Sequence, residues 1–201
     1  MSGISLHAGV SRGAAGRLHS PAVDARDLAA AAAARGFGVQ RVLIDCSAEL
    51  FLEELGCAVA RLRGADTLLL TFSGHGRVGA WCFADRDLAL RDVCSLLSSR
   101  RRGTRVVIVS DACHSESWPA LDDDVTLIAP AESHPLDGRG ANTRSPFTAA
   151  LIREWSAGVP PAVVGRPARR RAPGRAGRPT SAGGTPALRT RGGGTAARRR
   201  R

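Results

Sequence analysis

One histidine and one cysteine lie where apolar stretches of the chain end, and their side chains could carry out covalent chemistry together. His75 comes soon after the apolar run 67–72, and Cys113 comes soon after the apolar run 106–109. A cysteine thiolate with a histidine as its acid/base partner can attack a carbonyl carbon and form an acyl intermediate. The two residues therefore predict a cysteine-type endopeptidase.

The spacing of the two residues predicts that they meet. They are 38 residues apart, with one helical segment between the two apolar runs. A right-handed crossover of that length places two parallel strands side by side, so both side chains would emerge at the same edge of the sheet. We predict Cys113 as the nucleophile, His75 as the acid/base group, and the backbone N–H groups of Gly76 and Cys113 as donors to the oxyanion.

The same residue types also have simpler interpretations, which the pattern alone leaves open. A cysteine at the end of a strand is usually a small buried apolar residue, and a histidine beside glycine is usually a turn residue. The simpler interpretation is our prediction for the four other cysteines, Cys46, Cys57, Cys82 and Cys94, and for His7, His19 and His134. His114 is expected to point away from the nucleophile and support its loop.

The hydrophobic pattern predicts an α/β fold with a mainly parallel sheet, because strands that are apolar on both faces alternate with helices. The expected strands are 3–10, 39–45, 67–72, 81–84, 106–109 and 125–129. The expected helices are 21–34, 48–63, 87–99 and 146–155, with Ser20, Ser47 and Ser145 as caps of the first, second and fourth. The second helix is expected to bury Leu50, Leu52, Leu55, Val59 and Leu62.

Charge divides the 201-residue chain into a folded part, 1–158, and a tail, 159–201. The net charge is +11, yet residues 1–158 carry 17 arginines and 18 acidic residues, whereas the tail has 12 arginines and no acidic residue. The tail is also too poor in apolar residues to form a core, which predicts disorder. It is either a basic arm that binds nucleic acid weakly and nonspecifically, or the product of a shifted reading frame.

Several other classes of protein are excluded by composition. Neither a secretory signal nor a run of 18 apolar residues is present, so we expect no membrane association. The cysteines form no C-x-x-C pair, which argues against a zinc finger or a disulfide scaffold and favours free thiols in the cytoplasm.

Two motifs in this order resemble the signatures of the caspase-like cysteine peptidases, and most closely those of metacaspases and their bacterial relatives. They are Thr71-Phe72-Ser73-Gly74-His75-Gly76 and Ser110-Asp111-Ala112-Cys113-His114-Ser115. Segments 3–10, 24–28, 81–85 and 145–152 also resemble family segments, in the family's order. The resemblance spans about residues 3–158. It implies a caspase-like three-layer sandwich, with helices on both faces of the sheet and His75 and Cys113 as the dyad.

The resemblance also implies a specificity pocket. Asp24, Ser73 and Asp111 match the residues that line the primary pocket of metacaspases. Carboxylates in a pocket favour a cationic partner, so we expect cleavage of a protein or peptide substrate after Arg or Lys. Asp24 has an alternative role, because an acidic residue near a helix N-terminus stabilises the helix dipole.

The chain also departs from the family pattern. Ala112 and Glu116 replace a Ser and a Gly, and only residues 77–80 separate Gly76 from Trp81, where relatives carry an acidic insertion used by calcium-dependent members. We therefore expect no calcium requirement, no metal site and no cofactor. These departures leave a catalytically weak or inactive caspase-like interaction domain as the alternative function. Arg139 and Arg144 lie in a loop that could be self-cleaved, but nothing marks it as a cleavage site.

Overall fold

Five parallel strands form the central sheet of the computed structural model, which describes residues 3–13, 16–130, 137–138, 140 and 142–157. The strands are β1 (Gly3–Val10), β4 (Phe37–Ile44), β5 (Thr67–Gly74), β9 (Arg105–Asp111) and β10 (Val125–Ile128). Their order is β10-β9-β5-β1-β4, and every neighbouring pair is parallel. The predictions for the tail and for His134 lie outside the described residues.

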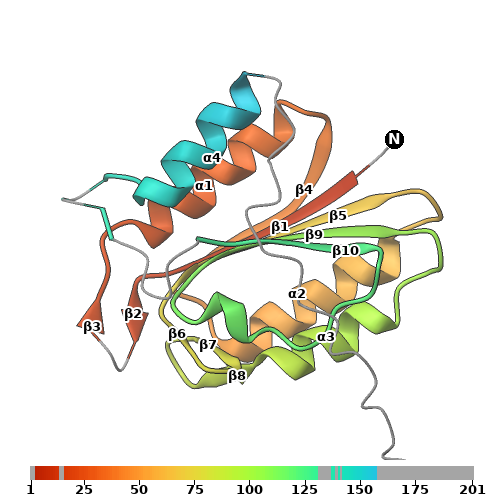
Figure 1. Ribbon diagram of the computed structural model, residues 1–201, viewed down its shortest axis with the longest axis horizontal. Helices are drawn as coiled ribbons and strands as arrows, with labels where there is room; N and C mark the ends of the chain where they lie inside the picture. The colour runs from red at the N-terminus through yellow and green to blue at the C-terminus, as the bar shows by residue number, and fades with distance from the viewer. Residues whose placement is uncertain (1–2, 14–15, 131–136, 139, 141, 158–201) are drawn as a thin grey trace, which may run out of the picture. The chain divides into compact units, whose positions relative to one another are not determined.

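Helices cover both faces of this sheet (Figure 1), which confirms the predicted three layers. On one face lie α1 (Pro21–Ala33) and α4 (Pro146–Ser156), and on the other lie α2 (Ala48–Arg61) and α3 (Leu90–Ser98). Alternate residues of the central strand serve both layers, because Leu68 and Leu70 pack with α2 and α3 whereas Leu69 packs with α1 and α4. None of the helices in the described residues has the length and apolar character needed to cross a bilayer.

Short strands and one 3-10 turn lie at the edge of the sheet where β5 and β9 end. A hairpin joins β2 (Arg12–Gly13) to β3 (Gly16–Arg17), and a second small sheet contains β6 (Gly76–Arg77), β7 (Ala80–Cys82) and β8 (Asp87–Ala89). The 3-10 turn η1 (Ser115–Ser117) follows Cys113. Of these, the sequence predicted only a strand near 81–84.

Two predictions about the helices on the α2/α3 face are wrong. The helix expected from Asp87 begins at Leu90, because residues 87–89 pair with β7 and bury Leu88 in the sheet. In α2, Leu50 is 37% exposed, and Phe51 takes the buried place at 0%. Phe51 lies on the same helix face as Leu55 and packs with it in the core, which turns Leu50 toward solvent.

Ser20 is the N-cap residue of α1, as predicted, but its side chain does not cap the helix, and a distant carboxylate binds it instead. Ser20 has helical φ and ψ angles of −81° and −34°, and its hydroxyl makes no hydrogen bond to the first turn. Asp137 instead accepts hydrogen bonds from the Ser20 N–H at 3.0 Å, from the Ser20 hydroxyl and from the His19 N–H. Partial burial opposes ionisation of Asp137, but these bonds outweigh it and lower its pKa to about 2.

Replacing this carboxylate tests its role at the helix. Asp137→Ala should lower the free energy of unfolding by about 1 kcal/mol, since the donors of His19 and Ser20 just before the helix lose their acceptor. Urea unfolding measures this difference. Glu53→Ala, which removes an exposed carboxylate from α2, should leave stability nearly unchanged. Equal effects of the two substitutions would contradict this role of Asp137.

Candidate active site

His75 and Cys113 follow neighbouring parallel strands at matching positions. Ser73 of β5 and Asp111 of β9 are paired across the sheet, at the last register position of the two strands. His75 and Cys113 each lie two residues beyond this pair. The structure thus brings both residues to the carboxyl edge of the sheet, as the crossover argument predicted.

The backbones of the two turns are in direct contact. A Cβ atom added to Gly76 would lie 2.2 Å from the carbonyl oxygen of Cys113 and 3.1 Å from the Cβ of Ala112. Side chains never tolerate a 2.2 Å approach to a backbone atom, so only glycine fits at this position. The close approach places Gly76, one of the two expected oxyanion donors, beside the backbone of the other.

The imidazole of His75 is held by the β2–β3 hairpin. Its Nε2 lies 3.2 Å from the carbonyl oxygen of Gly16. A carbonyl oxygen only accepts hydrogen bonds, so Nε2 carries the proton and Nδ1 is left available for proton exchange. The ring also passes close to Gly13, where an added Cβ would lie 3.3 Å from Cδ2 of His75. The sequence did not indicate this contact, because a backbone carbonyl has no residue signature.

Cys113 lies in a tightly folded turn and is half-buried with a free thiol. His114 has a left-handed backbone with φ of 58°, and its Nδ1 lies 3.3 Å from Glu116 Oε1. Within the described residues no hydrogen bond links the sulfur of Cys113 to His75. All five cysteines are free. Cys46 and Cys82 are buried as predicted, whereas the prediction is wrong for Cys57, which is exposed, and for Cys94, which is only half-buried.

A serine beneath the nucleophile turn ties it to the buried core. The hydroxyl of Ser115 donates to the carbonyl oxygen of Ala112 at 2.8 Å and lies 2.9 Å from the hydroxyl of Ser110. Ser110 in turn accepts from the indole N–H of Trp81 at 3.0 Å. This chain of buried hydrogen bonds fixes the turn against an aromatic cluster in which Trp81 stacks on Phe72.

The three expected specificity residues gather on the α1/α4 face of the sheet, next to the dyad strands. Asp24 is fully buried in α1, and its Oδ2 accepts a hydrogen bond from the Ser73 hydroxyl at 2.8 Å. Its other oxygen, Oδ1, accepts from the backbone N–H of Ser145 at 3.0 Å. Asp24 therefore has two specific partners, which a role limited to the helix dipole does not require.

Asp111 completes this group through α4. Its Oδ2 accepts hydrogen bonds from the Ser145 hydroxyl and, at 2.9 Å, from the Thr148 hydroxyl. Its Oδ1 accepts no hydrogen bond from the described residues, and the residue is 5% exposed. Ser145 thus contacts both carboxylates. The sequence predicted Ser145 only as the cap of this helix, which it also is, because its hydroxyl accepts from the Thr148 N–H.

Burial without a neighbouring cation raises the pKa of both carboxyl groups. Loss of solvent and the nearby charge of Asp111 raise the pKa of Asp24 to about 7, against the hydrogen bonds from Ser73 and Ser145. Burial likewise raises the pKa of Asp111 to about 6, against its bonds from Ser145 and Thr148. No positively charged side chain among the described residues bonds to either group, so an incoming cation would lower both pKa values and favour release of the protons to water.

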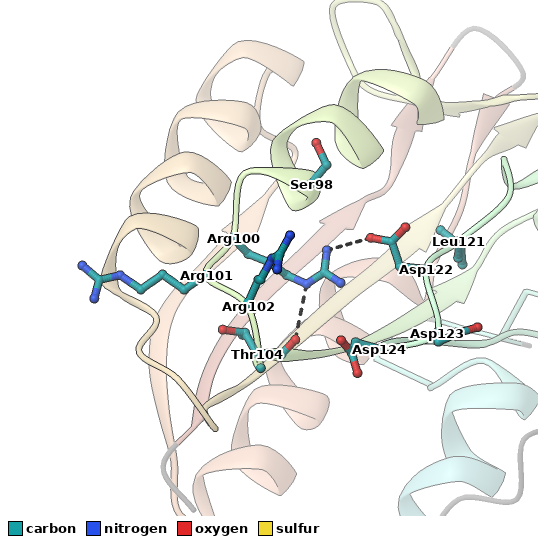
Figure 2. Close-up of a pocket in the computed structure, with 10 residues that line it drawn as sticks. Ser98, Arg100, Arg101, Arg102, Thr104, Leu121, Asp122, Asp123 and Asp124 are labelled. Carbon is teal, nitrogen blue, oxygen red and sulfur yellow. Dashed lines mark hydrogen bonds and ion pairs between the residues drawn. The ribbon is translucent and has the colours of Figure 1, made fainter.

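A groove of about 580 Å³ lies at the opposite edge of the sheet, away from this site (Figure 2). It is lined by Ser98 and residues 100–104, before β9, and by residues 121–124, before β10. Nη1 of Arg100 lies 3.2 Å from Oδ2 of Asp122. Arginine and aspartate side chains both line this groove, and the aspartates are the three consecutive ones at 122–124. No group of three possible metal ligands occurs among the residues that the structure describes.

The buried carboxyl pair should make stability depend on pH. A carboxyl whose pKa rises from 3.8 to about 7 on folding stabilises the protein while protonated, and this contribution is lost as the pH rises from about 4 through 7. The melting temperature of Asp24→Asn should therefore fall less between pH 5 and pH 8 than that of the wild type. Glu53→Gln, on the surface, serves as control. Parallel curves for the wild type and Asp24→Asn would contradict this account.

Comparison with known proteins identifies the family and agrees with the fold. The family model of the caspase domain matches residues 8–199. A solved structure of a Geobacter sulfurreducens protein is 25% identical with a TM-score of 0.67, and the alignment covers 79% of this chain and 83% of that chain.

Caspase-1 from Spodoptera frugiperda shares the fold at 18% identity and a TM-score of 0.58, over 78% of this chain and 68% of that chain. No curated protein sequence matches significantly. The family match covers most of the chain, and the arrangement of sheet and helices is that of a caspase. The chain therefore belongs to the caspase-domain family, whose general activity is that of cysteine peptidases.

Proposed function

We propose that this chain is a cysteine endopeptidase of the metacaspase type, in which His75 and Cys113 form the dyad and cleavage follows Arg or Lys. The observation that carries the proposal is the placement of His75 and Cys113 two residues beyond a paired position of adjacent strands. The backbone contact between Gly76 and Cys113 supports it further.

The catalytic steps follow from the atoms at this edge. The sulfur of Cys113 attacks the carbonyl carbon of the scissile amide, and its proton passes to Nδ1 of His75 while Nε2 keeps its bond to Gly16. Backbone N–H groups of Gly76 and Cys113 stabilise the oxyanion. The C–N bond then breaks as His75 returns the proton to the leaving amine. Water, deprotonated by His75, hydrolyses the thioester and restores the thiol.

The acidic cluster supports the choice of basic substrates. A guanidinium or ammonium group would give Asp24 and Asp111 the cation that they lack, and Oδ1 of Asp111 is available to accept from it. Both carboxylates are buried, Ser145 bonds to both of them, and Thr148 bonds to Asp111. A substrate side chain therefore reaches them by displacing the start of α4, and substrate binding should be coupled to movement of this helix.

The closed state of the cluster also favours a second candidate, a caspase-like interaction domain with weak or no catalysis. Asp24 is 0% exposed, and its two oxygens are already bonded within the chain. If the start of α4 does not move, no basic side chain can reach the two carboxylates, and the domain would bind partners without cleaving them.

Peptide hydrolysis separates the two candidates. With a fluorogenic peptide ending in Arg before the fluorophore, the wild type should release the dye, and Cys113→Ala should lower kcat by about 1,000-fold or more, because the nucleophile is removed. The control is Cys57→Ala, which removes an exposed thiol on α2 and should retain activity. Equal rates for the wild type and Cys113→Ala would contradict the peptidase proposal.

Substitution in the acidic cluster tests the specificity. Asp111→Asn should lower kcat/KM for the Arg peptide by about thirtyfold or more, since removing one partner of a buried charge pair costs at least about 2 kcal/mol. The control is Glu53→Gln on α2, an exposed carboxylate on the other face of the sheet. A higher kcat/KM for an otherwise identical Asp peptide in the wild type would overturn the proposed preference.

A further inference from the structure

The turn that carries Cys113 and the hairpin that follows His75 are joined by the hydroxyl of one residue, Ser117. We propose that Ser117 is a positioning residue that sets the nucleophile turn against the histidine turn. This inference rests on the proposed function and adds to it a residue that lies outside both signature motifs.

Ser117 contacts both turns through a single oxygen. Its Oγ accepts a hydrogen bond from the backbone N–H of Gly79 at 2.8 Å. The same hydroxyl donates to the carbonyl oxygen of His114 at 2.5 Å. His114 directly follows the nucleophile, and Gly79 lies at the turn between β6 and β7, so the hydroxyl bridges two segments that are 38 residues apart in sequence.

The bridge reaches His75 through the short β6–β7 hairpin. Gly76 pairs with Trp81 across this hairpin, and the backbone N–H of Cys82 donates to the carbonyl oxygen of His75 at 2.9 Å. The hairpin therefore moves with the histidine, and fixing Gly79 at its tip fixes the orientation in which the histidine turn meets Cys113. The Trp81 bond to Ser110 anchors the same hairpin at its buried end.

Loss of the hydroxyl should affect the chemical step more than binding. The specificity cluster lies on the α1/α4 face and makes no contact with Ser117 among the described hydrogen bonds, so substrate affinity should be kept. The Gly79 N–H and the His114 carbonyl would both lose a partner, and the hairpin tip would be free to shift. A displacement of about 1 Å between reacting groups is enough to lower a rate by about a hundredfold.

Three variants test this role. Ser117→Ala should lower kcat for the Arg peptide by between about tenfold and a hundredfold while KM changes by less than about twofold. Ser117→Thr, which keeps the hydroxyl at a half-buried position, should recover kcat to within about threefold of the wild type. The control is Ser98→Ala, which removes an exposed hydroxyl bonded only within its own helix, to Ser95, and should behave as the wild type.

A second readout does not need turnover. Brief alkylation with iodoacetamide near pH 6.5, followed by peptide mass mapping, gives the labelling of Cys113 relative to that of exposed Cys57 in the same sample. The wild-type ratio should be well above one, and Ser117→Ala should lower it at least about fivefold with little change in melting temperature.

The outcomes distinguish the two proposals. A wild type with neither Arg-peptide hydrolysis nor preferential labelling of Cys113 would overturn the peptidase function, and the role of Ser117 with it. An active wild type would leave the function standing. In that case, three results would overturn the role of Ser117 alone. The first is an unchanged kcat and labelling ratio in Ser117→Ala. The others are a Ser117→Thr variant as impaired as Ser117→Ala, or losses of activity that only follow a lower melting temperature.

Discussion

The pairing of β5 with β9 is the constraint on which the site depends. Their register continues to Ser73 and Asp111, so the residues that follow emerge at the same height on the same edge. A slip of one residue would turn each side chain to the opposite face. The apolar faces of both strands are buried against different helix layers, which penalises such a slip on either side. The contact of Gly76 with the Cys113 carbonyl then brings the two turns together, and the hydroxyl of Ser117 bridges them.

Successive side chains of β5 and β9 point to opposite faces of the sheet, which separates the acidic cluster from the contacts that support the nucleophile turn. Ser73 and Asp111 point to the α1/α4 face, where Asp24 and Ser145 meet them, whereas Phe72 and Ser110 point to the opposite face and pack around Trp81. One layer thus holds the acidic cluster and the other holds the nucleophile turn rigid. Because Ser145 begins α4 and bonds to both carboxylates, binding of a basic side chain and the position of this helix are linked.

Much of this arrangement was predictable because it rests on local patterns. Continuous apolar strands predicted a parallel sheet, and the spacing of His75 and Cys113 predicted adjacent strands. What the sequence could not show depends on tertiary contacts without a residue signature. The Gly16 carbonyl belongs to the backbone, and the acceptor that binds Ser20 is Asp137, far along the chain. The pattern at Ser145 predicts a helix cap whether or not a carboxylate faces it. The start of α3 was predicted three residues too early for the same reason, since pairing with β7 overrides the local helical pattern at residues 87–89.

The most direct test of the central claim, that His75 and Cys113 act on one amide, is covalent trapping with a peptidyl-arginine chloromethyl ketone followed by intact and peptide mass measurement. The account predicts one adduct per chain, located on Cys113, formed quickly by the wild type and at a greatly reduced rate by His75→Ala. Labelling spread over several cysteines, or labelling of Cys113 at the same rate with and without the imidazole, would contradict it.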